Sequence, residues 1–368
     1  MIDAVKFRPV VSFCIPVYNN AEAAQKIVNG LLVSDDPRFE VVVNDNASTD
    51  DTQEVLSQIH DDRFRFYRND TNLGPHRNWQ TALEHGRGTY LFLSMIRDKL
   101  YGEKVTDLID ILEQAHRENI TLLQDGYEPY RIYNGIDAMI RFLRIDHPTA
   151  TIFDGEIFHA IPDRKRYFEI SDMYPENYVK RDCLLKGKGA TIFSGVYDVH
   201  HREGYFRASK NSHSTVECGK PLFDMYYAPR RINIQIFELI DMIECEESGG
   251  FSENGINRYF TAQFRDLLYR VSIGWYSQSN NGSKYYGQPP RKVTMREMFG
   301  NILDAYRNTK THLQDKGIFS RVKRRIMYRC TAEMLARVFL YASVKLSAKK
   351  ILAPLGVWKL LQKIKHSR

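Results

Sequence analysis

The chain has 368 residues and a mass of 43.0 kDa, and its residues are 43% hydrophobic, 26% charged and 12% aromatic. This is the balance of a globular protein with a sizeable core, and it excludes a disordered or fibrous chain. The five cysteines are scattered and form no CxxC pair, which disfavours both a disulfide framework and a structural zinc site. The sequence opens without a signal-peptide pattern and has no run of eighteen apolar residues, which predicts a cytoplasmic protein.

Charge is divided unevenly along the chain. Residues 310–368 contain 15 Lys and Arg against only Asp315 and Glu333, a local balance of +13, which leaves −6 on residues 1–309 from the chain total of +7. The sequence therefore predicts a basic tail beside an acidic body.

The first hundred residues alternate short β-rich runs with helix-like segments. Strands are expected at residues 10–15, 39–44, 63–68 and 89–93, and helices at residues 21–32, 51–59 and 76–86. This alternation predicts an α/β fold with parallel strands and crossover helices on both faces of the sheet. Ligands of such sheets bind beyond the carboxyl ends of the strands, so functional residues are expected just after each strand.

Polar residues follow all four expected strands, in the segments 16–20 (PVYNN), 45–50 (DNASTD), 69–74 (NDTNLG) and 94–98 (SMIRD). Any one of these segments fits ordinary turn and helix-cap chemistry, because Asn, Asp, Gly and Pro favour such positions for backbone reasons. Their placement at four successive strand ends points instead to one shared binding site.

Three ordered motifs carry a family resemblance. The runs VSFCIPVYNN, VVVNDNASTDDT and NLGPHRNWQTALEHGRGTYLFL resemble the inverting family 2 glycosyltransferases, which use nucleotide-sugar donors. The resemblance covers roughly residues 9 to 100. It implies a GT-A-like (Rossmann-like) nucleotide-sugar-binding domain, followed by a mainly helical C-terminal region.

The resemblance implies a nucleotide site after the first two strands. Pro16, Val17 and Tyr18 are implied to line the base, and Asp45, beside Asn46, to accept hydrogen bonds from the base or the ribose. An N-cap on the helix that follows is the alternative role of Asp45.

Further donor contacts are implied after the third strand. Asn72, Gly74, Arg77 and Asn78 stand where relatives place polar contacts to the donor. Arg77 suits the diphosphate because a guanidinium is planar, permanently charged and able to bind in a bidentate way. A solvated arginine on a helix face is the alternative.

The metal motif departs from the family. Relatives carry an Asp-X-Asp triplet after the fourth strand, and the corresponding triplet here is Ile96-Arg97-Asp98. Asp98 alone could hold a divalent cation, Mn²⁺ or Mg²⁺, if phosphate oxygens and waters supplied the other ligands. Alternatively Arg97 supplies positive charge at the donor in place of part of the ion's role, or transfer has been lost and only binding remains.

An inverting transfer needs a carboxylate that takes the proton of the acceptor hydroxyl. Relatives often carry a Glu-Asp pair ahead of a helix that ends in a Gly-Lys turn, and here the pair reads Glu176-Asn177. Because asparagine is not a useful base, the resemblance moves the catalytic role to Glu176 or to Asp172. Each of these also fits an exposed acid near a helix start.

Residues 147–153 resemble the loop that lies between donor and acceptor in relatives. Later, residues 223–276 have helical apolar spacing, and a polar loop is expected at residues 277–283. Three parts are therefore expected: a glycosyltransferase domain at 1–220, a helical extension at 221–309 and a basic amphipathic tail at 310–368.

The tail combines an apolar stripe with flanking cations. Phe319, Val322, Ile326, Cys330, Met334, Val338 and Tyr341 form the stripe. Such a helix suits an anionic membrane surface, and the resemblance to enzymes that extend polyprenyl-linked glycans fits that location. Packing on its own protein or in a homo-oligomer is the alternative, and no nucleic-acid module is recognised.

These observations predict an inverting glycosyltransferase that moves a sugar from a nucleoside-diphosphate donor of the UDP type to a saccharide or polyprenyl-linked glycan in cell-surface polysaccharide biosynthesis. A catalytically degenerate binding or scaffolding subunit of the same fold is the alternative. The expected location is cytoplasmic, with peripheral attachment to the inner face of the cell membrane.

Overall fold

The computed structural model describes residues 8–96, 98–126, 128–145, 148–163, 166–167, 174–198, 216–217, 220–221, 228–244, 250–281 and 292–352. The chain divides into two compact units. Unit 1 comprises Met1–Gly219 with Asp241–Ile256, and unit 2 comprises Lys220–Ile240 with Asn257–Arg368. The expected boundary between 309 and 310 falls inside helix α15 (Met295–Asp315), because that helix continues without a break and packs against the next one.

Unit 1 begins with the alternation that the sequence predicts. Its first elements are β1 (Val11–Val17), α1 (Ala21–Leu32), β2 (Phe39–Asp45), α2 (Thr52–Ser57), β3 (Phe64–Arg68), α3 (Pro75–His85) and β4 (Tyr90–Leu93). There follow η1 (Gly102–Lys104), α4 (Val105–Arg117), β5 (Ile120–Asp125), β6 (Arg131–Tyr133), α5 (Gly135–Phe142), β7 (Thr151–Asp154), α6 (Gly155–Ala160), α8 (Glu176–Lys186), β8 (Lys188–Ile192) and the two-residue strand β9 (Val216–Glu217).

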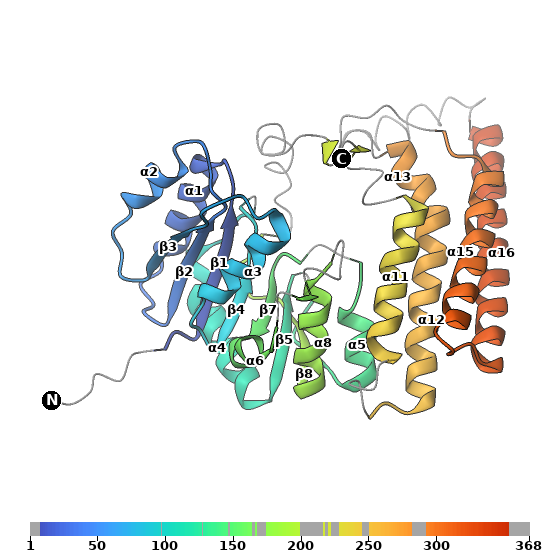
Figure 1. The fold of residues 1–368 in the computed structure, drawn as a ribbon. Helices are drawn as coiled ribbons and strands as arrows, with labels where there is room; N and C mark the ends of the chain where they lie inside the picture. The colour runs from blue at the N-terminus through green and yellow to red at the C-terminus, as the bar shows by residue number, and fades with distance from the viewer. Residues whose placement is uncertain are drawn as a thin grey trace. The chain divides into compact units, whose positions relative to one another are not determined.

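Eight strands of unit 1 form one sheet in the order β3-β2-β1-β4-β7-β5-β8-β6 (Figure 1). The pairs β1–β2, β2–β3, β1–β4 and β5–β8 are parallel, whereas β7 and β6 run antiparallel to their neighbours. The carboxyl ends of β1, β2, β3, β4, β5 and β8 therefore meet at one edge of the sheet. The chain winds from β1 to β3 in one direction and then returns to β4 on the other side of β1, so a topological switch point lies between β1 and β4.

Helices cover both faces of this sheet, as predicted. Val11, Phe13, Ile15 and Val17 of β1 share a buried cluster with apolar residues of α1 and α4. Cys14, which points to the other face because side chains alternate along a strand, lies against the turn after α3, where Gly86 has no room for a Cβ. The core of the unit therefore lies on either side of the central strands and fixes the strand ends in space.

A buried carboxylate closes the opposite, amino-terminal edge of the sheet. Glu40 is 1% exposed and accepts hydrogen bonds from the Ser12 hydroxyl (2.6 Å) and the Arg87 guanidinium (2.6 Å). The Ser12 hydroxyl also accepts from the backbone N–H of Gly88 (2.8 Å). The Gly-Arg-Gly turn before β4 thus joins the starts of β1 and β2 through hydrogen bonds, at the edge of the sheet opposite the motifs.

Apart from one two-residue strand, the described elements of unit 2 and of the parts of the chain that join it are helical. The elements are β10 (Lys220–Pro221), α11 (Pro229–Glu244), α12 (Glu253–Tyr269), the π-helix η3 (Arg270–Gly274), α13 (Trp275–Asn281), α15 and α16 (Arg321–Leu352). The prediction of a polar loop at residues 277–283 is wrong for residues 277–281. Helix α13 continues to Asn281, and Ser279 is buried there. Asn301 of α15 donates a hydrogen bond to the carbonyl of Val271 (3.0 Å), which satisfies a backbone group in the π-turn.

The predicted apolar stripe of the tail lies on α16. Ile326, Cys330, Met334 and Val338 are between 0% and 9% exposed, and α16 packs on α15. These four residues therefore pack within the protein, which is the alternative to a membrane-facing stripe given in the sequence analysis. Within the residues that the structure describes, no helix is long and apolar enough to cross a membrane. The segment after Pro354 lies outside the described residues.

Candidate active site

The predicted polar segments come together at the carboxyl edge of the unit 1 sheet. Tyr18–Asn20 follow β1, Asn46–Asp50 follow β2, Asn69–Gly74 follow β3 and Ser94–Met95 follow β4. The first and last of these flank the switch point between β1 and β4. The site that the sequence predicts as one surface is therefore assembled from neighbouring strand ends.

A cluster of asparagines, which we call the asparagine cluster, fastens these segments together. It consists of Asn44, Asn46, Asn69, Asn72 and Asn78. Asn44 Nδ2 donates to Asn78 Oδ1 (2.6 Å) and Asn69 Oδ1 (3.2 Å), and Asn69 Nδ2 donates to Asn46 Oδ1 (3.0 Å). Asn46 Nδ2 donates to Asn72 Oδ1 (2.8 Å). Because each amide carries both donors and acceptors, the cluster links three strand ends without any net charge.

Asn78 occupies the centre of the cluster. It is 3% exposed, and its Nδ2 donates to the carbonyls of Val17 (3.2 Å) and Asn44 (3.3 Å). The sequence analysis places Asn78 among the polar contacts to the donor. The contacts of its side chain within the protein indicate that it positions the ends of β1 and β2, and a direct contact with the donor stays a prediction.

Asp45 is fully buried and already bonded. Its carboxylate forms an ion pair with Arg68 at the end of β3, and it accepts hydrogen bonds from the hydroxyl and the backbone N–H of Ser48 (3.1 Å for the N–H). Helix α2 begins at Thr52 with Asp51 at its N-cap, so Asp45 does not cap that helix. Arg68 keeps 33% of its side chain exposed and was not anticipated from the sequence. A direct contact of Asp45 with the base or the ribose stays a prediction.

The expected base-lining residues differ in exposure. Pro16 and Val17 belong to β1 and are buried, whereas Tyr18 is partly exposed. The next residue, Asn19, locks this turn to the turn after β2, since its N–H donates to Ser48 Oγ (2.8 Å) and its Oδ1 accepts from the N–H of Thr49 (2.8 Å). Tyr18 therefore projects from a turn that is held on both sides, and a role for it in stacking stays a prediction.

The cationic candidates lie near the start of α3 and after β4. Arg77 is in the first turn of α3 and is partly exposed. A helix N-terminus favours anions through its free N–H groups and its dipole, which adds to the charge of Arg77. Arg97 lies outside the described residues.

Asp98 organises the turn after β4. Its Oδ2 accepts hydrogen bonds from the N–H of Met95 (2.7 Å), from Ser94 Oγ (3.2 Å) and from Thr149 Oγ1. Among the residues that the structure describes, no three His, Cys, Asp or Glu side chains gather in a way that could hold a metal ion. The described side chains therefore offer no site for a cation that is held by protein ligands alone. A cation shared between Asp98 and the phosphates of a nucleotide-sugar stays a proposal.

Thr149 also ties Asp98 to the second half of the sheet. The carbonyl of Thr149 accepts a hydrogen bond from Gln124 Nε2 of β5 (3.0 Å), and the N–H of Asp125 donates to the carbonyl of Ala150 (3.0 Å). The segment expected between donor and acceptor, of which residues 148–153 are described, therefore bridges the end of β4 and the end of β5.

Glu176 lies at the start of α8. Thr121 near the start of β5 donates to the carbonyl of Cys183 near the end of α8 (2.7 Å), so this helix runs antiparallel to β5. That direction brings Glu176 to the same edge of the sheet as the end of β5. Glu176 is 3% exposed, and Asn177 Nδ2 donates to the carbonyl of Arg144 (3.1 Å). Asp172 lies outside the described residues.

Asp125 at the end of β5 is a residue that the sequence analysis missed. It is 3% exposed and accepts hydrogen bonds from the hydroxyl and the N–H of Ser194 (3.0 Å for the N–H), just after β8. Burial raises the pKa of Asp125 to about 6, although the bonds from Ser194 act in the opposite direction. Its partner is 69 residues away in the sequence, so no local motif announces the pair.

The segment after Asp98 is paired with the segment after β8. Leu100 bridges Tyr197, and the hydroxyl of Tyr101 donates to Asp198 Oδ2 (2.9 Å). Lys99 Nζ lies 3.9 Å from the same carboxylate oxygen. The two ends of the candidate site, at β4 and β8, are thus held together by a short antiparallel pairing.

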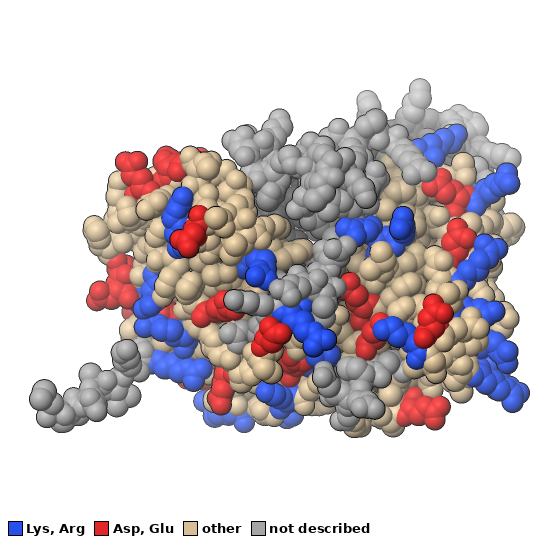
Figure 2. Space-filling view, viewed as in Figure 1, with Lys and Arg blue, Asp and Glu red and all other residues tan. Residues whose placement is uncertain are grey.

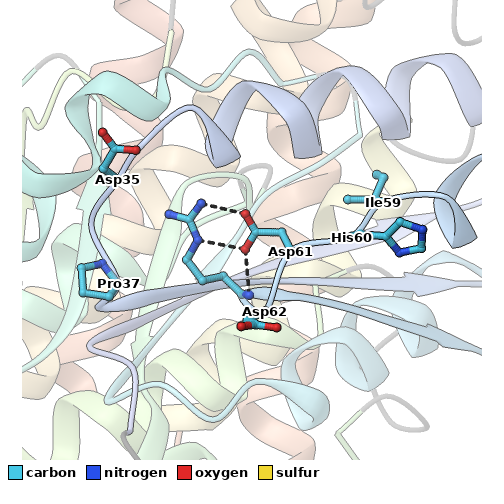
Figure 3. Close-up of a pocket in the computed structure, with 7 residues that line it drawn as sticks. Asp35, Pro37, Ile59, His60, Asp61 and Asp62 are labelled. Atoms are coloured by element: carbon cyan, nitrogen blue, oxygen red, sulfur yellow. Dashed lines mark hydrogen bonds and ion pairs between the residues drawn. The ribbon is translucent and has the colours of Figure 1, made fainter.

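A separate cavity of about 780 Å³ opens at the opposite edge of the sheet (Figure 3). Its lining residues precede β2 and β3 and include Asp35, His60 and Asp62. The Arg63 guanidinium there is bonded to Asp61 (2.8 Å), which lowers the pKa of that carboxyl. None of the predicted site residues that the structure describes lines this cavity, so the candidate active site remains the carboxyl edge.

Known proteins match the part of the chain that carries these strand ends. A family model described as glycosyl transferase family 2 matches residues 12–94, which contain all four motif-bearing strand ends up to Ser94. Among curated proteins, the chain is 23% identical over 269 residues to the poly(ribitol-phosphate) beta-N-acetylglucosaminyltransferase TarS of Staphylococcus aureus, covering 68% of this chain and 44% of TarS. It is 30% identical over 112 residues to the abequosyltransferase RfbV of Salmonella typhimurium, covering 28% of this chain and 33% of RfbV. The chain thus spans less than half the length of these two relatives.

Solved structures show the same fold. The crystal structure of residues 1–349 of S. aureus TarS matches with a TM-score of 0.54 and 14% identity, covering 89% of each chain. A structure of the same TarS fragment in complex with UDP-GlcNAc matches with a TM-score of 0.50 and 15% identity, covering 89% of this chain and 90% of the other. These matches identify the unit 1 sheet as a GT-A-like fold with a helical region after it. Residues 12–94 thus form a domain that matches the glycosyl transferase family 2 model.

Proposed function

We propose that this chain transfers a sugar from a nucleoside-diphosphate donor, of the UDP type, to a saccharide or polyprenyl-linked glycan acceptor in cell-surface polysaccharide biosynthesis. The observation that carries the proposal is the convergence of the family motifs at the switch point of the sheet, fastened by the asparagine cluster. A relative supports the donor class, since TarS is an N-acetylglucosaminyltransferase and a fragment of it was crystallised with UDP-GlcNAc.

In the proposed donor complex the base lies beside Tyr18 and the turn that Asp45 and Ser48 stabilise. Asn72 and Arg77 are the proposed contacts to the ribose and the diphosphate, and the sequence adds Arg97, which lies outside the described residues. A Mn²⁺ or Mg²⁺ ion, if bound through Asp98 and the donor phosphates, would neutralise charge on the leaving diphosphate. Because Asp98 Oδ2 is already used by three donors of the protein, we expect weak affinity for the metal.

Glu176 is the proposed general base. In an inverting displacement the acceptor hydroxyl attacks the anomeric carbon opposite the nucleoside diphosphate, and its proton passes to the carboxylate of Glu176. Inversion of an α-linked donor gives a β-linked product. The position of Glu176 at the carboxyl edge supports this role, and Asp172 is the other candidate from the sequence.

We further propose a cytoplasmic location with peripheral attachment of the basic tail to an anionic membrane, and we leave a homo-oligomer as a proposal from the sequence. Exposed cations on α16 support the attachment. The buried state of Cys14, Cys183 and Cys330, which are free thiols among the described residues, is compatible with a reducing compartment.

Calorimetry with UDP, GDP, CMP and dTDP, each with and without Mn²⁺, tests the donor site directly, because a nucleotide that binds the folded state raises its apparent stability. Selective UDP binding is the expected result. Release of UDP from a UDP-sugar in the presence of acceptor glycans should then fall in Asp98→Ala. Binding of UDP without any turnover over a broad acceptor panel would favour the degenerate scaffolding subunit, and no nucleotide binding would overturn the proposal.

A further inference from the structure

A second cavity of unit 1 lies at the far end of the sheet, away from the donor loops. Its volume is about 530 Å³, and it is lined by β6, by α5 and by Arg144 just after α5. Three of its lining side chains are arginines, at positions 131, 141 and 144, and Asp137 is the acidic one among them. The lining therefore carries a net positive charge.

An aromatic ring lies among these cations. The guanidinium carbon of Arg131 lies 5.3 Å from the centroid of the Tyr133 ring, and that of Arg141 lies 6.0 Å from it. Tyr133 is held edge-to-face against Phe142, with centroids 5.7 Å apart. The Tyr133 ring therefore holds guanidinium groups in place by cation–π contacts, and such positioned cations suit a sugar or polyol that carries an oxyanion, because they pair with the anion.

The three arginines are not equally engaged. Arg141 is paired with Glu128 (2.9 Å) and keeps 25% of its side chain exposed. Arg131 and Arg144 are exposed. These two are therefore the cations that solvent, or a ligand, reaches.

The cavity adjoins the acceptor side of the candidate active site. Arg131 pairs with Thr191 near the carboxyl end of β8, and the carbonyl of Arg144 accepts the hydrogen bond of Asn177, the neighbour of Glu176. In the sheet order β6 lies four strands beyond β4, which at about 4.8 Å per strand is roughly 19 Å. That separation is too large for the diphosphate of a donor bound at β1 and β4, so a donor does not explain the arginines.

We propose that this arginine cavity, defined by Arg131, Tyr133, Arg141 and Arg144, binds an oxyanion of the acceptor, and that the acceptor is therefore an anionic glycan or polyol polymer rather than a single neutral sugar. The inference rests on the proposed function, and it deepens it by naming the acceptor class. A phosphate diester or a carboxylate supplies the required chemistry, since a guanidinium pairs with two oxygens of either group.

The test uses the full chain and three oligomers of similar length: glycerol-phosphate units joined by phosphodiesters, oligogalacturonate and neutral maltoheptaose. The double variant Arg131→Gln/Arg144→Gln removes the two exposed cations. The control for the loss of two charges is Arg117→Gln/Arg166→Gln, at exposed positions of the same unit. The single variant Arg117→Gln, at the end of α4 near the opposite edge of the sheet, is a second control. Calorimetry at physiological salt reports the affinity, and thermal unfolding reports the fold.

We expect the wild-type chain to bind one or both anionic oligomers and not maltoheptaose. The double variant should lose about tenfold or more in affinity, which corresponds to about 1.4 kcal/mol or more, while the controls change less than about twofold. Selective binding of the phosphate oligomer assigns a phosphate-bearing acceptor, and selective binding of oligogalacturonate assigns a carboxylate-bearing one. Equal affinity of the double variant and the wild type, equal losses in the controls, or binding of maltoheptaose as strong as that of the anions would overturn the proposal.

UDP binding is measured in the same samples, so the two proposals fail separately. Loss of oligomer binding with unchanged UDP affinity is the result expected of an acceptor subsite. Arginine-dependent binding of an anionic oligomer by a chain that binds no nucleotide would sink the proposed transfer reaction and the acceptor role, leaving only an anion site.

Discussion

At the scale of single residues, the environment of each carboxylate decides what it can do. Asp45 is bonded to Arg68 and Ser48, and Asp98 to the turn after β4, so both are used in part to hold loops. Glu176 is instead placed by the start of a helix at the edge of the sheet. Its place at the carboxyl edge, at the position that the family resemblance assigns to the base, keeps Glu176 the proposed group for proton transfer.

Glu176→Gln tests that role. The change keeps the shape of the side chain but removes the base, so UDP release should fall by about 100-fold or more while UDP affinity stays within about twofold. Glu156→Gln, at an exposed position in the first turn of α6, is the matched control and should retain full activity. An active Glu176→Gln enzyme would move the base elsewhere, with Asp172 as the next candidate.

Asp125 makes a prediction about pH. Its pKa is about 6 in the folded chain against an ordinary value of 3.8, so the folded state binds the proton more tightly. Its contribution to stability is therefore full below about pH 4 and is lost as the pH rises through 6, by up to about 3 kcal/mol.

Asp125→Asn should abolish that loss, because the amide stays neutral and its oxygen can still accept from the N–H of Ser194. The free energy of unfolding of the variant, relative to that of the wild type, should be higher at pH 7.5 than at pH 4.5. Thermal or urea unfolding of both proteins across this range measures the difference. Parallel pH profiles would show that Asp125 does not titrate as inferred.

At the scale of elements, the strand ends are joined by neutral amides rather than by ion pairs alone. The asparagine cluster links β1, β2, β3 and α3, and at its centre the buried Asn78 contacts the ends of β1 and β2. A network of this kind holds the geometry of a polar site without adding charge that would compete with a nucleotide.

Asn78→Ala should therefore weaken both the fold and the site. Loss of its bonds leaves buried donors and acceptors unsatisfied, at a cost of about 1–3 kcal/mol, and UDP affinity should fall as the loops loosen. Asn29→Ala, the same change at an exposed position of α1, should alter neither. Denaturant unfolding and calorimetry on the two variants give the comparison. An Asn78→Ala protein of unchanged stability would refute the structural role of the cluster.

At the scale of the whole molecule, the charge of the chain is carried by its last part. Figure 2 shows Lys and Arg side chains along α16, and Arg321, Arg324, Arg325 and Arg329 are exposed there. The central apolar stripe of the same helix is buried within unit 2. Attachment of this surface to a membrane would consequently depend on charge more than on apolar burial, with roughly 1 kcal/mol for each cation near an anionic surface.

Co-sedimentation with vesicles measures this dependence. The full chain should bind vesicles with anionic lipid at low salt, release from them at high salt, and ignore vesicles of neutral lipid. Replacement of Arg321, Arg324, Arg325 and Arg329 by Gln should abolish binding. The control variant carries Gln at four exposed cations of unit 1, namely Lys26, Arg117, Arg166 and Lys186. It has the same net charge as the α16 variant and should still bind the vesicles. Binding that resists salt, or equal losses in both quadruple variants, would contradict a charge-driven surface on α16.

The sequence alone determined the first half of unit 1 and the place of its site. The strands and helices up to Leu93 lie within two residues of the expected bounds. A strand that is buried on both faces is a continuous apolar run, and a helix with one buried face repeats apolar residues every three or four positions, so both are visible in the sequence. The turn residues after each strand were visible for the same local reason. The rule that parallel strands end at one edge then placed them together.

The tertiary structure decided what periodicity does not encode, namely which segments become neighbours. Strand β7 inserts antiparallel between β4 and β5, which brings Thr149 to Asp98, and Ser194 meets Asp125 across 69 residues. Asn78 could be read from the sequence as a ligand contact, yet its partners are carbonyls of the strand ends. The stripe of α16 likewise shows that a pattern reveals an apolar face, whereas only packing reveals what covers it.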